Sequence, residues 1–202
     1  GRRRRRHHRG VAVVSAAVWY FSRATGLVSL VLFTGVVVLG ALGAGRFATP
    51  SWPRFAVAAV HRNLALTSLG FLAAHIATAV LDGYVSLGWL DVVLPFGAGY
   101  QPFWVGLGAV AIDLLLAIVV TSLVRTRLPA RVWRAVHWLA YLCWPVALVH
   151  GIGMAEDDSA HGWIIALDVL CAVAVLGAVA YRAGVKHADT ETRKLSPLGG
   201  TR

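Results

Sequence analysis

Four histidines lie inside segments that are otherwise apolar. His61 and His75 bracket HRNLALTSLGFLAAH and are 14 residues apart, while His137 and His150 bracket HWLAYLCWPVALVH and are 13 apart. Ionisable side chains are costly in segments of this kind and are usually functional there. Imidazole is also a common metal ligand. Two histidine pairs at nearly equal spacing therefore indicate metal ligation.

The helical geometry of the two pairs differs. Fourteen residues rise about 21 Å and thirteen about 19.5 Å, and both lengths fit inside a hydrocarbon layer of about 30 Å. Fourteen steps of 100° return to within about 40° of the starting direction, so His61 and His75 can face one neighbour. Thirteen steps reach about 220°. We expect Pro145 to bend the second helix and to re-aim His150.

The helices that carry these histidines are expected to cross a membrane. The 202 residues are 58% hydrophobic and 14% charged, whereas soluble domains are about one-quarter charged. We predict an all-α integral membrane bundle with both termini in the cytoplasm. A short sixth N-terminal helix at 11–21, followed by a turn at SRATG, is favoured over one long helix that continues into the first span. The five clear spans are 27–45, 57–81, 103–124, 132–154 and 162–182.

The positive charges lie beside the spans. The net charge is +10, and no Lys or Arg occurs between 63 and 124. The positive-inside rule places 46–62, 125–134 and 182–194 in the cytoplasm and the loops 82–102 and 155–161 outside. We therefore expect a multi-pass cell-membrane protein whose partner is the bilayer, not nucleic acid. The expected division is an Arg-rich cytoplasmic tail at 1–10, a transmembrane domain at 11–182 and a cytoplasmic tail at 183–202.

The two histidine helices are separated by one span, so they run in the same direction. His61 is then level with His137, and His75 is level with His150. Each level offers two imidazoles to a flat, mostly apolar group, which fits haem b, for which imidazole is a standard ligand. No CxxCH haem-attachment motif occurs. Transport of a metal ion is the competing interpretation, but it would add carboxylates or thiols at ligand distance.

Haem propionates need cationic or hydrogen-bonding partners. Near the inner level, Arg62 and Arg134 are the first candidates, although positive-inside topology explains the same residues equally well. Asp113 and Asp168 lie within spans, and their roles stay open. The further candidates are Arg54 and Arg131 at the inner level, and Tyr84, Tyr100, Gln101, His161 and Arg23 at the outer level.

Three segments resemble the ferric reductase-like transmembrane domain family: WYFSRATGLVSLVLFTGVVVLG, HRNLALTSLGFLAAH and RVWRAVHWLAYLCWPVALVHG. That family includes the membrane parts of ferric reductases and NADPH oxidases. It also includes the haem subunit of the periplasmic methionine sulfoxide reductase system, which commonly lacks the histidine found here as His61. The resemblance covers about residues 19–182. It implies two stacked b haems, held by His61 with His137 and by His75 with His150.

The resemblance also implies a function. We expect a cytochrome subunit that moves electrons from a cytoplasmic flavoprotein or membrane quinol to an extracytoplasmic acceptor protein or metal chelate. No flavin or nicotinamide site is expected, because about 20 residues follow the last span and contain no GxGxxG. No catalytic residue is assigned. The alternatives are direct reduction of ferric chelates at the outer face, and a haem-binding membrane protein without redox function.

Overall fold

The computed structural model describes residues 2–195 except 46, 48, 50, 83–86 and 156–160, with side chains described within 17–185 except at these gaps and at 161. Every helix of this part except the short α3 and η1 is at least eight residues long. The elements are α1 (Arg2–Ala44), α2 (Arg54–Leu81), α3 (Trp89–Val93), α4 (Pro102–Leu123), the 3₁₀ helix η1 (Arg125–Arg127), α5 (Ala130–His137), α6 (Ala140–Gly153) and α7 (His161–Leu195).

Five membrane spans are present in the described residues, and they confirm the five that the hydropathy predicts. Each is long and apolar enough to cross a bilayer. They comprise Ala17–Ala44 of α1, all of α2, all of α4, α5 and α6 together, and Gly162–Val185 of α7. The chain is therefore a multi-pass membrane protein.

The separate sixth helix expected at 11–21 is wrong. α1 is one continuous helix from Arg2 to Ala44, and the segment SRATG lies inside it. Thr25 explains how a segment that reads as a turn stays helical. Its hydroxyl donates to the carbonyl oxygens of Phe21 (2.8 Å) and Ser22 (3.0 Å) within the same helix, so its polar group is satisfied without breaking the backbone pattern.

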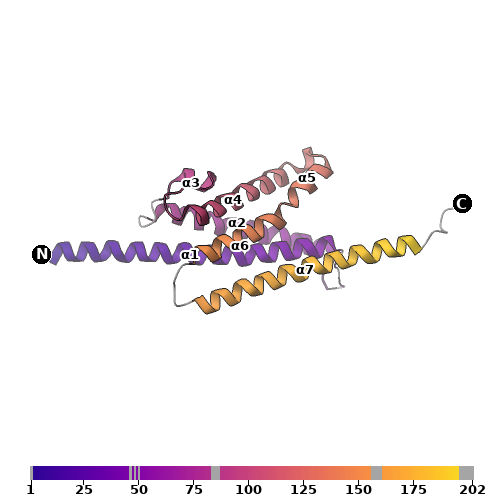
Figure 1. Cartoon of the computed structure of the whole chain (residues 1–202), viewed down its shortest axis with the longest axis horizontal. Helices are drawn as coiled ribbons and strands as arrows, with labels where there is room; N and C mark the ends of the chain where they lie inside the picture. The colour runs from indigo at the N-terminus through magenta and orange to yellow at the C-terminus, as the bar shows by residue number, and fades with distance from the viewer. Residues whose placement is uncertain are drawn as a thin grey trace.

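The continuous α1 changes the expected topology. With five spans the two chain ends lie at opposite ends of the bundle, as Figure 1 shows. Five crossings would put the two ends of the chain on opposite sides of a membrane. The cytoplasmic assignment of both tails, 1–10 and 183–202, stays a prediction.

The fourth span is interrupted directly after His137. The backbone N–H groups of Leu139, Tyr141 and Leu142 bond to carbonyl groups three residues earlier. Bonding of this kind turns the chain by about 120° per residue instead of 100°. The extra rotation brings His150 toward the face of His137, which a straight helix would not do. The break lies at Trp138 and Leu139, whereas Pro145 sits inside α6, so the change of direction begins before the proline, and a bend at Pro145 itself stays a prediction.

α1 and α2 are antiparallel and share a regular set of hydrogen bonds. Three α1 carbonyl oxygens, each seven residues from the next, accept bonds from three α2 side chains with the same spacing. The pairs are Ser22 with His75 (2.8 Å), Ser29 with Ser68 (3.3 Å) and Val36 with His61 (3.0 Å). A return bond from Ser29 Oγ to the Ser68 carbonyl measures 3.4 Å. These bonds fix the register of the two helices.

The bundle is packed on one side of each helix and apolar on the other. Trp144 of α6 is buried against Val37 of α1 and Cys171 of α7, and its Nε1 donates to Thr34 Oγ1 at 2.9 Å. The outer side of α7 is exposed and apolar, with Leu176 67% exposed. A bilayer satisfies such a surface, whereas a soluble protein rarely presents one.

Candidate functional site

The first predicted histidine pair is brought together. His61 comes from α2 and His137 from the last residue of α5, and their ring centroids are 6.3 Å apart at an interplanar angle of 60°. Imidazole nitrogen binds a transition metal at about 2 Å, as zinc sites show, which places the centroids of two rings on opposite sides of one metal about 6 to 6.5 Å apart. The separation therefore would allow the two imidazoles to hold one metal group between them.

The second predicted pair lies one level away on the same two spans. His75 is 14 residues along α2 from His61, and His150 lies on α6. Both residues line the same cavity. Among the described residues, no group of three His, Cys, Asp or Glu side chains gathers as a metal site. Each pair thus supplies two nitrogen atoms and no further ligand, which is what a porphyrin iron requires.

One continuous cavity of about 2260 Å³ reaches both pairs. A pocket for a single small ligand usually measures about 300–1,000 Å³, so this cavity is large enough for two large flat groups. Between the two levels its lining is mostly apolar and includes Leu30, Phe33, Leu72, Leu115 and Ala147. This lining excludes water from the space between the pairs.

Hydrogen bonds fix the tautomer of three of the four imidazoles. The Nδ1 atoms of His61, His75 and His150 lie 3.0, 2.8 and 2.7 Å from the carbonyl oxygens of Val36, Ser22 and Trp104. A carbonyl oxygen can only accept, so each Nδ1 donates and each neutral ring keeps its lone pair on Nε2. A histidine that ligates a metal is commonly oriented in this way by its other nitrogen.

His137 is held differently. Its ring stacks on Trp133, one turn earlier on α5, with centroids 5.0 Å apart and an interplanar angle of 25°. The Arg125 guanidinium lies 5.3 Å from the centroid of the same Trp133 ring. The His137 Nδ1 is buried and has no hydrogen-bond partner within the part of the chain that the structure describes. Stacking, not a backbone carbonyl, orients this histidine.

Three buried nitrogen atoms near this end of the cavity have no hydrogen-bond partner among the described residues. They are the Nδ1 atom of His137, the Nε1 atom of Trp133 and the Nε atom of Arg182. Buried polar groups are rarely left without a partner. All three residues line the cavity, so acceptors that enter the cavity would satisfy them. The carboxylates of a haem are acceptors of this kind.

Most of the arginines predicted for the inner level line the cavity. Arg54, Arg62 and Arg134 do so, whereas Arg131 does not. Arg125 and Arg182 also line it, although neither was a predicted site residue. Arg182 donates to the hydroxyl of Tyr141, and its guanidinium carbon lies 4.3 Å from the Trp138 ring centroid. Because Arg182 is 45 residues from His137 and farther still from His61 in the sequence, its place at the cavity could only be found from the fold.

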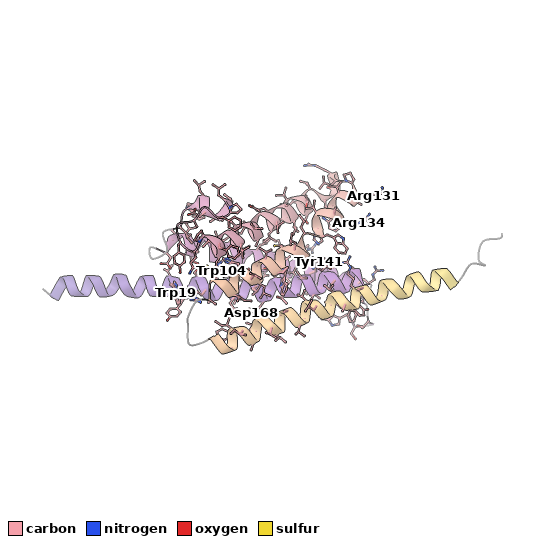
Figure 2. The ribbon with its side chains drawn as sticks, in the orientation of Figure 1. Trp19, Trp104, Arg131, Arg134, Tyr141 and Asp168 are labelled. Carbon is pink, nitrogen blue, oxygen red and sulfur yellow. The ribbon has the colours of Figure 1, made fainter. Side chains whose placement is uncertain are left out.

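Arg23 is the cation at the opposite end of the cavity. Its guanidinium lies 4.5 Å from the Trp19 ring centroid, and its Nη2 donates to the carbonyl of Met154 at 3.5 Å. Trp19 and Trp104 mark this end, while Arg131 and Arg134 lie toward the other (Figure 2). Of the other candidates for the outer level, Tyr100 lines the cavity, whereas Tyr84 and the His161 side chain lie outside the described residues.

The two aspartates within spans occupy different positions. Asp168 is buried and lines the cavity, and Figure 2 shows it on α7. Asp113 is exposed on α4 and does not belong to the lining. Only Asp168 is therefore placed where it can influence a group inside the cavity.

The comparisons with known proteins agree with this geometry. The family model named "Ferric reductase like transmembrane component" matches residues 25–148, more than half of the chain. The chain belongs to this family. No curated protein and no solved structure gave a significant match.

Ferric reductase-like domains bind haem, and the matched segment contains three of the four histidines. His61, His75 and His137 lie inside it, while His150 lies two residues beyond its end. His150 therefore lies outside the segment that the family model matches, but it lines the same cavity as the other three histidines. The ligand roles of all four histidines remain predictions.

Proposed function

We propose that this chain carries electrons across the membrane through two haem b groups. His61 and His137 hold one, and His75 and His150 hold the other. The observation that supports this most strongly is the pairing of four imidazoles at two levels of one apolar cavity. The two levels are about 21 Å apart along α2, so groups bound at both would bridge most of the hydrocarbon layer.

Haem b, when bound, supplies a one-electron ferric/ferrous couple. The chain supplies the rest of the function. The Nε2 lone pairs of the three carbonyl-bound histidines point away from their own hydrogen bonds and are available to iron. The apolar lining between the levels keeps water out and lowers the local dielectric, which is one of the ways in which a protein sets a haem potential.

The charges of the cavity support an orientation. All but one of the described arginines that line it, Arg23 being the exception, lie toward the end that carries η1 and α5, and positive charge marks the cytoplasmic side of membrane proteins. We therefore place His61 and His137 near the cytoplasm, with a flavoprotein or membrane quinol as the electron donor. An extracytoplasmic acceptor protein or metal chelate would then receive electrons from the level of His75 and His150.

The test is a haem count and a redox titration of the purified full-length chain. We expect two haems per chain and two one-electron transitions. His75→Ala should remove one haem and His61→Ala the other, so that each variant retains about one per chain. One haem or none in the unmodified chain, or loss of both haems in either variant, would contradict the proposal.

The donor and acceptor are tested in the same preparation. Reduction by a quinol analogue would identify the membrane pool as donor, whereas reduction only by NADH with a flavoprotein reductase would identify a soluble one. In proteoliposomes, oxidation of the reduced chain by an external ferric chelate would favour direct chelate reduction. Haems that neither donor reduces would overturn electron transfer and favour haem binding alone.

A further inference from the structure

A glycine faces each of the three histidines that donate to a backbone carbonyl. An added Cβ at Gly26 would lie 2.8 Å from Cε1 of His75, one at Gly108 would lie 2.7 Å from Cε1 of His150, and one at Gly40 would lie 3.3 Å from Cε1 of His61. Non-bonded carbon atoms normally pack at about 3.5–4.0 Å. None of these three positions therefore accommodates a side chain while the ring stays in place.

Each glycine occupies the same position relative to the carbonyl that the histidine uses. Gly26, Gly40 and Gly108 come four residues after the acceptors, which are Ser22, Val36 and Trp104. In a helix every Cα–Cβ bond tilts toward the N-terminus, so a side chain covers the turn before it. Removing the side chain at the fourth residue uncovers the carbonyl. A ring can then approach its second lone pair while the first keeps the helical bond.

Smaller donors in the same bundle do not need this opening. Ser68 Oγ donates to the Ser29 carbonyl, and the residue four positions after Ser29 is Phe33. Cys143 Sγ donates to the Ala111 carbonyl, and the residue four positions later is Leu115. Glycine makes up 21 of the 202 residues. Abundance therefore does not explain why a glycine stands four residues after each of the three carbonyls that accept from an imidazole, and after neither of the two carbonyls that accept from Ser68 and Cys143.

We propose that Gly26, Gly40 and Gly108 are positioning residues for the haem ligands. Each opens a helix surface so that a backbone carbonyl fixes the Nδ1–H of one histidine and directs its Nε2 into the cavity. The inference rests on the proposed function, because it concerns the same histidines. It goes further by assigning ligand orientation to α1 and α4, which carry no ligand. His137 has no such glycine, so the two sites are not equivalent.

The experiment replaces each glycine by alanine in the full-length chain and measures haem content, the low-spin ferric EPR signals and both midpoint potentials. Gly26→Ala and Gly108→Ala should lower the haem count from two toward one and remove the signal that His75→Ala removes. Gly40→Ala, which is less crowded, should keep both haems. It should shift the signal and midpoint potential of the site that His61→Ala removes.

Gly35→Ala is the matched control. Gly35 lies on α1 between Gly26 and Gly40, and an added Cβ would lie 2.7 Å from Cδ2 of Leu64 on α2, a contact as tight as those at the histidines. This control should retain both haems with unchanged spectra and potentials, even if its thermal stability falls. If Gly35→Ala gives the same spectral changes as Gly26→Ala, or if the three glycine variants leave both sites unaltered, the inference is overturned.

The failure of this inference is distinguishable from failure of the proposed function. If the histidine variants do not remove haems one at a time, the ligand assignment itself is wrong. If they do, but Gly26→Ala and Gly108→Ala lose both haems together, the glycines serve only helix packing. In a variant that loses one haem, the remaining haem serves as a folding control. If its spectrum is native, the chain is folded.

Discussion

At the scale of the residue, the two histidine pairs differ in what holds them. His75 and His150 both donate to carbonyl groups, whereas His137 stacks on Trp133 and makes no such bond among the described residues. A hydrogen bond from Nδ1 raises the basicity of a ligating imidazole, and stronger donation favours ferric iron. The cavity arginines beside His61 and His137 favour the ferrous form at that site. With haem bound as proposed, both effects would give the site of His61 and His137 the higher midpoint potential.

Arg182 is predicted to raise that potential. Removing its charge in Arg182→Gln disfavours the reduced, more negative iron, so the midpoint should fall. A unit charge about 10 Å away at an effective dielectric constant near 20 contributes roughly 1.7 kcal/mol, on the order of 70 mV for one electron. A redox titration measures the shift. Arg182→Lys should keep most of the potential, and Arg131→Gln, which is off the cavity lining, should change neither transition.

Arg23 is predicted to act on the other site. It lies on the cavity lining at the end of Trp19, and its partner Met154 is one turn beyond His150. Arg23→Gln should lower the midpoint of the haem that His75→Ala removes, again by tens of millivolts, and leave the second transition in place. A shift confined to the site of His61 would show that Arg23 lies at the wrong end for this role.

The placement of the histidines along one cavity could be predicted from the sequence, because ionisable residues in apolar spans are rare and their spacing converts directly into height along a helix. Which arginines line the cavity was only partly predictable. Arg62 and Arg134 are near the histidines in the chain, whereas Arg182 reaches the cavity only because α7 returns past it. Glycines in spans usually indicate close helix packing, and only the carbonyl bonds reveal what Gly26 and Gly108 face.

At the scale of the element, hydropathy located the spans because length and apolar content decide whether a helix crosses a bilayer. It missed the continuity of α1, since a short apolar run before SRATG resembles a separate helix. It also missed the break after His137. That break depends on backbone bonds with a three-residue spacing, which hydropathy and the position of Pro145 do not reveal.

The α1–α2 pair offers a test of helix register. Ser29 and Ser68 are buried and exchange hydrogen bonds through their hydroxyl and carbonyl groups. Ser29→Ala and Ser68→Ala should each destabilise the bundle by about 0.6 kcal/mol, typical of hydrogen bonds between membrane helices, while both haems are retained. The measurement is unfolding in mixed micelles. Thr67→Ala is the control, because its hydroxyl bonds only to its own helix and it should have a smaller effect.

At the scale of the whole molecule, the odd number of spans makes a prediction about sidedness. In a variant without Cys143 and Cys171, single cysteines at positions 10, 99 and 127 would be labelled by a membrane-impermeant maleimide. Positions 10 and 99 should react from the outside and position 127 from the cytoplasm, because α1 crosses once and Gly99 precedes α4. Labelling of position 10 together with position 127 would require an additional crossing and would contradict the continuous helix.

The seven-residue spacing of the bonds between α1 and α2 has a practical consequence for protein design. Sliding α1 by one turn would break all three bonds together, so main-chain atoms of α1, which carries none of the four histidines, fix the ring orientations of His61 and His75 at the same time. Transplanting the four histidines into another bundle would therefore not reproduce the site. The smallest portable unit for one side of it is the helix pair, residues 22–40 with 61–75.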